Sequence, residues 1–415
     1  MKRQPIAATG PGLMSRDFML LWSVGGIGNF MRWLEGLAAA LFTLDVTGSP
    51  LAVAVVTASR SLPLIATGAL AGVIADALDR RAIVAGGLLV SALAAAAMAL
   101  LARAGVLAPW HLVVAGLANG LVYGTDMPAR RRMLGESVEP ALTGRAIALD
   151  SLTASLSRGA GPLAGGAAYQ ILGVAGVFAV TAALSLLAAW LALRVRHAQP
   201  YRTLSPAAVA ADLLEAVAVV RRMPVLIALM AATLGQNLFG FAYTALMAPV
   251  GRDVFGASAA LIGVLAAAEP AGAGLGGAAL ALGFGPPGRP VWLLVGGSVW
   301  FLIALALTAT APWFWACALL LFLGGFGIAV YSNEQSTIAL GEAPAAVRSR
   351  VMGLATTAIG GWPLGMLLAG WLADRVGPLS AMAALGAGGL AWQAAVAAGP
   401  GRRAAIARPG TPAPP

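Results

Sequence analysis

The chain has 415 residues, of which 60% are hydrophobic and only 10% are charged, and its mean hydropathy is +0.86. A soluble protein carries charge on about a quarter of its residues, so this composition excludes an ordinary soluble protein. About 20 apolar residues cross the hydrocarbon core of a bilayer, so the chain can form about twelve membrane spans and no large soluble domain. Because Cys317 is the single cysteine and the two histidines are far apart, we expect no disulfide, metal or cofactor.

Charges, Gly/Pro clusters and turn residues divide the apolar sequence into twelve segments. The predicted spans are 18–44, 51–75, 82–102, 109–128, 146–171, 174–195, 224–249, 257–283, 290–311, 312–334, 351–373 and 379–398. The predicted fold class is therefore an all-α membrane protein with twelve transmembrane helices in two six-helix bundles. The domain limits are 1–195 for the N-terminal bundle, 196–223 for a cytoplasmic linker, 224–399 for the C-terminal bundle and 400–415 for a disordered cytoplasmic tail. In the linker, 206–223 fits an amphipathic surface helix or a plain connector.

The net charge of +10 is distributed by topology. With both termini in the cytoplasm, 20 basic residues fall in inner segments and three in outer ones, and Arg32, Arg60 and Arg158 fall within spans. This asymmetry removes the main reason to expect a nucleic-acid partner. We expect a monomeric, multi-pass protein of the bacterial inner membrane.

The two halves of the chain repeat each other at an offset of about 207 residues, which indicates an internal duplication. The matching positions are Val122–Asp126 with Val330–Glu334, Gly28-Asn29 with Gly235-Gln236, and Arg60 with Glu269. A six-plus-six repeat of membrane helices around a midplane site is typical of secondary transporters.

The loop after the second span combines Gly72, Asp76, Arg80 and Arg81. This pattern resembles the signature of the major facilitator superfamily, in which the equivalent aspartate and arginines latch the cytoplasmic gate. The resemblance implies that these four residues act in gating. Ala77 occupies a position where the family usually has arginine, so part of the latch is missing from the pattern.

The fifth span contains Gly161, Pro162, Gly165 and Gly166. This run is similar to the glycine-proline motif of proton-coupled exporters in the same superfamily, although Ser157 replaces an upstream glycine. The similarity favours export. The alternative is that small residues only permit close helix packing. Over nearly its full length the chain resembles the branch that contains the enterobactin exporter and macrolide efflux proteins.

Polar side chains at membrane depth are candidates for function, because a charge at the bilayer centre costs at least about 2.5–3.5 kcal/mol. Glu35 and Arg60 lie at matching depth on the first two spans, which predicts an interhelical pair, either functional or a structural salt bridge. For Trp362, as for Trp33, a lipid-facing or packing role is the alternative. The candidate substrate and proton cavity comprises Asn29, Arg32, Glu35, Arg60, Arg158, Gln236, Asn237, Glu269 and Trp362.

The inner ends of the fourth and tenth spans carry the carboxylates Asp126 and Glu334. Each has arginines nearby, Arg130 in the first case and Arg350 in the second. Their repeat-related placement predicts gate salt bridges, with ordinary helix-end charges as the alternative.

These features predict a proton-coupled secondary transporter that exports a small organic compound, drug-like or siderophore-like, by alternating access. The intramembrane charges sum to +1, which suggests an acidic substrate, and Glu35 or Glu269 is expected to carry the proton. The expected partners are a small-molecule substrate, protons and the lipid bilayer. Uptake of a nutrient or organic acid is the alternative, followed by a non-transporting sensor. No grouping of nucleophile, base or metal ligands suggests an enzyme.

Overall fold

The computed structural model describes residues 12–64, 79–196, 215, 217–343, 354 and 358–406, and these form helices and connecting loops without a strand. The N-terminal half contains α1 (Arg16–Thr47), α2 (Pro50–Ser59), α4 (Arg80–Arg103), α5 (Pro109–Glu136), η1 (Pro140–Leu142) and α6 (Thr143–Leu193). The C-terminal half contains α8 (Pro224–Gly235), η2 (Gln236–Gly240), η3 (Phe241–Leu246), α9 (Met247–Pro249), η4 (Val250–Val254), α10 (Ala259–Ala281), α11 (Pro290–Leu307), η5 (Thr308–Thr310), α12 (Phe314–Gly341), α14 (Gly361–Val376), α15 (Pro378–Val396), η6 (Ala397–Gly401) and α16 (Arg402–Ile406).

The turn between α1 and α2 follows from local sequence. Gly48 ends α1 with φ 61°, a left-handed conformation that glycine adopts without strain. Ser49 then caps α2 by accepting a hydrogen bond from the backbone N–H of Ala52, and Pro50 occupies the first helical position. The chain therefore reverses direction within a few residues.

Helix α2 ends earlier than the predicted span 51–75. Its last residue is Ser59, and Arg60 is the C-terminal cap. Pro63 explains the break, because proline has no N–H to donate to the carbonyl of Ser59 and its ring crowds that carbonyl. Residues 65–78, which include Gly72 and Asp76, lie outside the described part of the chain.

Helix α6 contains the fifth and sixth predicted spans. A straight helix of its 51 residues would be about 75 Å long, more than twice the hydrocarbon thickness. Gly173 interrupts it with φ 65° and ψ −179°, which are not helical values. The predicted division between 146–171 and 174–195 is confirmed.

Seven described helical segments are long and apolar enough to cross a membrane, and the longest, Pro140–Leu193, is the one that Gly173 divides. The seventh predicted span, 224–249, is less regular than expected and continues in π and 3-10 turns to Val254. At the first wide turn the side chain of Gln236 lies where a Cβ on Gly240 would project. Glycine at this position leaves room for the buried amide.

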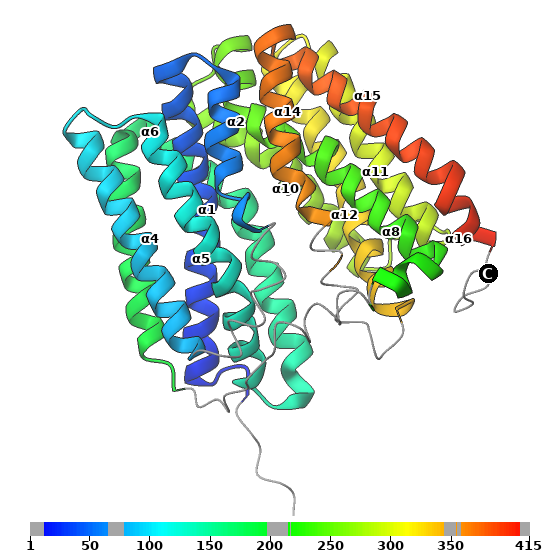
Figure 1. Cartoon of the computed structure of the whole chain (residues 1–415), viewed down its shortest axis with the longest axis horizontal. Helices are drawn as coiled ribbons and strands as arrows, with labels where there is room; N and C mark the ends of the chain where they lie inside the picture. The colour runs from blue at the N-terminus through cyan, green and yellow to red at the C-terminus, as the bar shows by residue number, and fades with distance from the viewer. Residues whose placement is uncertain are drawn as a thin grey trace, which may run out of the picture.

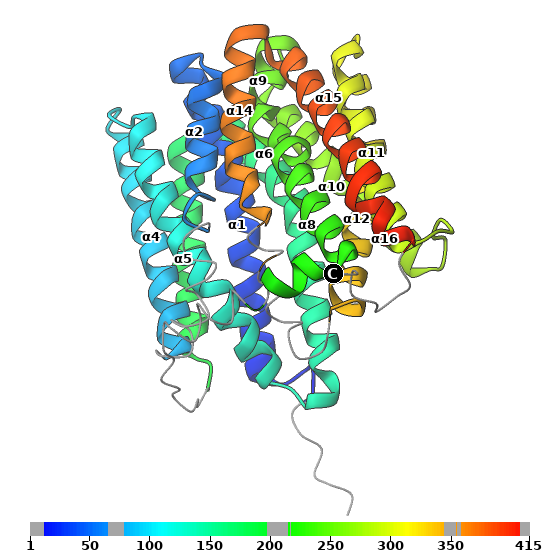
Figure 2. The same cartoon turned by 45° about the vertical axis from the view of Figure 1, so that its right-hand side comes forward.

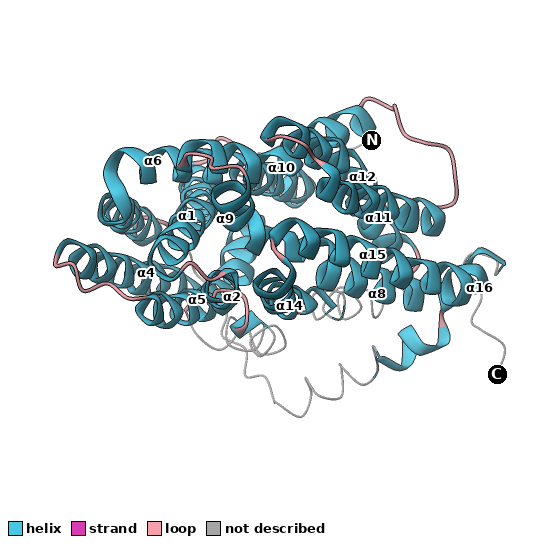
Figure 3. Cartoon of the chain, turned by 90° about the horizontal axis from the view of Figure 1, so that it is seen from above, coloured by secondary structure: helices cyan, strands magenta, loops and turns pink. Residues whose placement is uncertain are grey.

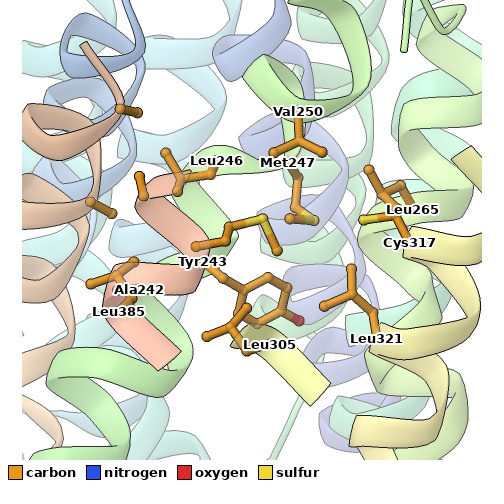
Figure 4. Packing of buried hydrophobic residues seen from close by; sticks show 14 of the residues in the cluster. Ala242, Tyr243, Leu246, Met247, Val250, Leu265, Leu305, Cys317, Leu321 and Leu385 are labelled. Carbon is orange, nitrogen blue, oxygen red and sulfur yellow. The ribbon is translucent and has the colours of Figure 1, made fainter. Parts of the chain in front are cut away.

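The two halves stand beside each other (Figure 1). In the view of Figure 1 their upper ends lie together and their lower ends diverge, and the turned view of Figure 2 shows α2 next to α14. Seen from above, α2 and α14 again lie side by side (Figure 3). The largest apolar cluster fills the C-terminal half around Tyr243, Leu265, Cys317 and Leu321 (Figure 4).

Candidate functional site

A cavity of about 80 Å³ lies between the two halves, and we call it the central cavity. Its side chains come from α1, α2 and α6 on one side and from η3, α9, α10 and α14 on the other. The indole rings of Trp33 and Trp362 form a tilted aromatic pair in its wall, with centroids 6.3 Å apart and an interplanar angle of 38°. Trp362 donates a hydrogen bond from Nε1 to the carbonyl of Phe241 (3.1 Å), which fixes its ring. Trp33 and Trp362 both line the cavity.

Glu35 and Arg60 form the predicted interhelical pair. The distance from Arg60 Nη2 to Glu35 Oε1 is 2.6 Å, and both side chains are at least nine-tenths buried. Arg60 Nη2 also donates to the backbone carbonyl of Arg32 (3.1 Å). Arg60 lines the central cavity and Glu35 lies behind it.

A second ion pair joins the two halves at mid-depth. Arg158 of α6 pairs with Glu269 of α10. Glu269 is fully buried, and its carboxylate also accepts a hydrogen bond from the hydroxyl of Tyr243 (3.0 Å). Arg158 and Tyr243 line the central cavity, whereas Glu269 lies behind them. Sequence reasoning missed Tyr243, because an uncharged side chain in an irregular helical stretch carries no signal of its own.

Arg32 is placed differently from the other two arginines. Its guanidinium stacks on the ring of Tyr123, 3.9 Å from the centroid, and within the described residues no ion pair is found for it. Arg32 lines the central cavity together with Arg60 and Arg158. The cavity wall therefore carries three cations, of which two are neutralised by glutamates.

Asn29, Gln236 and Asn237 do not line the central cavity, so this part of the prediction is wrong. Gln236 accepts a hydrogen bond from Ser298 Oγ (2.5 Å), and Ser298 in turn accepts one from Gln393 Nε2 (2.8 Å). Asn237 donates to the carbonyl of Thr233 (2.9 Å). Both amides face the interior of the C-terminal half, where α8 and η2 pack against α11 and α15.

Arg130 does not pair with Asp126, contrary to the expectation. Its guanidinium lies 2.6 Å from Asp150 Oδ1, and Arg131 Nε reaches the other oxygen of Asp150 at 2.9 Å. Asp126 Oδ1 is buried without a hydrogen-bond partner among the described residues. A carboxylate at the start of the fifth span was visible in the sequence, but only the packing of α5 on α6 shows which acid Arg130 meets.

The other gating candidates that the structure describes, Arg80, Arg81 and Glu334, lie at the same end of the molecule as Arg130. Arg80 pairs with Glu136 (2.8 Å), and Arg81 donates to the carbonyl of Leu193. Glu334 is buried and accepts a hydrogen bond from the amide of Asn333 (3.0 Å). Arg350, like Gly72 and Asp76, lies outside the described residues.

The glycines of the fifth span pack against two neighbouring helices. A Cβ at Gly161 or Gly165 would overlap α1 near Trp33 and Leu34, and one at Gly166 would overlap α10 at Ala259. Pro162 of the same motif lines the central cavity. The glycines thus permit the close helix packing that the sequence left as the alternative, and a role in export stays a prediction.

Polar contacts also join the halves at the end away from Arg130. Arg252 Nη2 lies 3.0 Å from Asp45 Oδ1, and the hydroxyl of Tyr169 donates to the other oxygen of Asp45 (2.8 Å). Asp374 accepts hydrogen bonds from the hydroxyl of Ser49 and the backbone N–H of Leu51, each at 3.2 Å. At this end the two halves are held together.

A family model described as transmembrane secretion effector matches residues 8–403. The chain belongs to this family. It is of the major facilitator type, and it is a multi-pass membrane protein and a secondary transporter. No curated protein is similar enough in sequence to count as a match.

Solved structures of transporters share the fold. A mutant of the peptide transporter POT has a TM-score of 0.74 at 15% identity, with 98% of this chain and 100% of that chain covered. A mutant of the nucleoside transporter NupG has a TM-score of 0.69 at 15% identity, with 92% and 99% covered. A bacterial homolog of the human lysosomal transporter Spinster, inward-facing and unoccupied, has a TM-score of 0.70 at 16% identity, with 92% and 94% covered. These likenesses confirm the predicted fold class, and the family and its structural neighbours are membrane transporters rather than enzymes.

Proposed function

We propose that this transporter exports a small amphiphilic organic compound in exchange for protons. The observation that carries the proposal is the Arg158–Glu269 pair, which joins the two halves beside the central cavity. Breaking a buried ion pair is costly, so this contact opposes movement of the halves while the cavity is empty and Glu269 is ionised. A compound that separates the pair, or a proton on Glu269, removes that obstacle.

Exchange follows if the compound alone or the proton alone can release the Arg158–Glu269 pair and the pair holds when neither is bound. A carrier that cannot change state while empty and unprotonated, and that holds the compound and the proton one at a time, carries the compound one way and a proton the other. In the predicted orientation the Asp45–Arg252 contact closes the outer end, so the structure corresponds to the inward-facing state that would load a compound from the cytoplasm. The family description, secretion effector, supports the outward direction. Membership of the branch containing the enterobactin exporter remains part of this proposal.

The arginines of the central cavity favour a second candidate, cotransport of an organic anion with a proton. An anion bound to Arg158 displaces Glu269 and leaves a buried carboxylate unpaired, which favours protonation of that carboxylate. Anion and proton then bind together and move in the same direction, as in uptake. A neutral compound leaves the positive charge of Arg158 uncompensated beside Glu269, which keeps the carboxylate ionised. Exchange therefore fits a neutral substrate, and cotransport fits an acidic one.

Transport by proteoliposomes distinguishes the two candidates. If the protein exchanges, an acid-inside pH gradient should drive accumulation of labelled chloramphenicol, a neutral probe. If it cotransports, an acid-outside gradient should drive accumulation of the anionic dye carboxyfluorescein. Absence of pH-driven flux for both probes and for a wider compound panel would refute proton coupling.

The carboxylates are tested in the same assay. Glu269→Gln and Glu35→Gln should each lower pH-driven flux by about tenfold or more, because an amide cannot carry the proton. Exchange of labelled for unlabelled probe at equal pH should continue in both. Glu342→Gln, at the end of α12, is the matched control and should behave as wild type. Unimpaired pH-driven flux in both Glu35→Gln and Glu269→Gln would overturn the proposed role.

A further inference from the structure

A second cavity, of about 70 Å³, lies inside the N-terminal half, and we call it the N-terminal cavity. Its walls belong to α1, α4, α5 and α6 and to Arg60 at the end of α2, and the lining residues that it shares with the central cavity are Arg32 and Arg60. Asn119 and Arg130 both line it, and at 1.5 Å per residue they lie about 16 Å apart along α5. The cavity therefore runs from the level of the Glu35–Arg60 pair toward the end where Arg130 meets Asp150.

Three buried oxygen atoms in this cavity lack a hydrogen-bond partner among the described residues. They are Asn119 Oδ1, Asp126 Oδ1 and Thr181 Oγ1, and all three residues line the cavity. Buried polar atoms in native proteins are nearly always satisfied, by protein groups or by ordered water. One water needs about 10–15 Å³ of such space and two to four polar partners, so the cavity has room for several waters.

The charges around the cavity favour water and protons over a metal cation. The charged or titratable side chains that line it are Arg32, Glu35, Arg60, Tyr123, Asp126 and Arg130, and Asp150 of α6 reaches it through its pair with Arg130. Three lining arginines outnumber two lining carboxylates, which disfavours a bound metal cation, whereas a proton is held on a carboxylate and neutralises it. The two carboxylates lie at opposite ends of the cavity: Asp126 is near Arg130, and Glu35 is at the level of its pair with Arg60.

We propose that the N-terminal cavity holds a chain of water molecules that passes protons between Asp126 and Glu35. Protons then reach Glu35 through the N-terminal half, apart from the substrate in the central cavity. Since Arg32 and Arg60 line both cavities, a proton on Glu35 changes the charge balance at the wall of the substrate site. The proton role rests on the proposed function, whereas the water chain does not.

Hydroxyl-radical footprinting by X-ray radiolysis of the full-length protein in detergent tests the water chain, because radicals form where water is bound. Met31 lines the N-terminal cavity although it is only 4% exposed, and Met133, 1% exposed, is packed in an apolar cluster of the same half. Met31 should be oxidised about fivefold faster than Met133 if several waters occupy the cavity. Equal protection of the two methionines would overturn the water chain, whatever the transport assays give.

Substitutions that remove polar atoms without changing shape much test the path itself. Thr181→Val and Asn119→Leu should slow oxidation of Met31 and lower the ratio of pH-driven to equal-pH flux by about tenfold or less, since other waters can reroute the chain. Thr43→Val is the matched control: Thr43 is also fully buried, but its hydroxyl donates to the carbonyl of Ala39 (2.7 Å) and it does not line the cavity. If a pH gradient drives flux in the wild-type protein, and both cavity variants keep the wild-type ratio of pH-driven to equal-pH flux, the proton path is overturned. If the flux of the wild-type protein does not depend on the pH gradient, the proposed function is overturned instead. The water chain is then judged by the footprinting result alone.

Discussion

The interiors of the two halves differ, although the halves repeat each other in sequence. In the N-terminal half Asn29 lines a polar cavity that also contains Glu35 and Arg60. Its repeat partner Gln236 in the C-terminal half is fully buried in a neutral hydrogen-bond network with Ser298 and Gln393. The duplication seen in the sequence therefore does not preserve the chemistry of the interior. At this pair of positions the N-terminal half encloses a charged cavity, whereas side chains fill the interior of the C-terminal half.

The charged network of the N-terminal half should give the largest effect on stability. Asp150→Asn leaves the guanidinium of Arg130 buried beside a neutral amide, and removing one partner of such a pair costs about 3–5 kcal/mol. Unfolding in mixed micelles, followed by tryptophan fluorescence, measures the loss. Asp126→Asn is the matched change and should cost about 1 kcal/mol or less, because its Oδ1 makes no hydrogen bond. An equal loss in the two variants would restore Asp126 as the partner of Arg130.

The neutral network of the C-terminal half should give an intermediate effect. Ser298→Ala leaves Gln236 Oε1 without its donor, at a cost of about 1–3 kcal/mol, while Gln393 Nε2 keeps its bond to the carbonyl of Ala232 (3.1 Å). Cys317 is fully buried in this half, so the rate at which a thiol-reactive fluorophore labels it on heating reports the loss. Ser332→Ala, at an exposed position of the same half, should leave labelling unchanged. If Ser298→Ala changed the substrate concentration at which transport is half-maximal, the network would extend to the central cavity after all.

The contact between the halves should give the smallest effect. The Arg252–Asp45 side chains are about a third exposed, and exposed ion pairs contribute only about 0–1 kcal/mol. Arg252→Gln should therefore leave stability nearly unchanged but lengthen the distance between spin labels on the two halves at this end. High salt should lengthen the same distance in wild type, since it screens exposed charges, and should have no further effect in the variant. Arg103→Gln, an exposed arginine in another outer segment, is the control.

Much of the fold could be predicted because the signals are local. Ser49 and Pro50 mark the start of α2, and Gly173 marks the division of α6, in each case through backbone preferences of the residues themselves. The break after Ser59 was also readable from Pro63, but an apolar run through a proline favoured one continuous span.

The candidate site was predictable only in part. Matching depth on consecutive helices was enough to predict the Glu35–Arg60 pair, because neighbouring spans in the chain pack together. The Arg158–Glu269 pair joins residues 111 positions apart, and Tyr243 entered the site without any charge to mark it. Their positions along the predicted spans placed Arg158 and Glu269 near the middle of the membrane but could not show that the two side chains are in contact.

The sequence by itself determined that this protein lives in a bilayer, that it is helical, and where most helices begin and end, because hydropathy and capping act over a few residues. Only the tertiary structure decided which face each polar residue presents and which partner it meets. Arg130 pairs with Asp150 rather than with Asp126, and the side chain of Gln236 lies inside the C-terminal half rather than in the central cavity. The physical reason is that rotation of a helix about its axis is set by packing against distant segments, which a hydropathy pattern does not record.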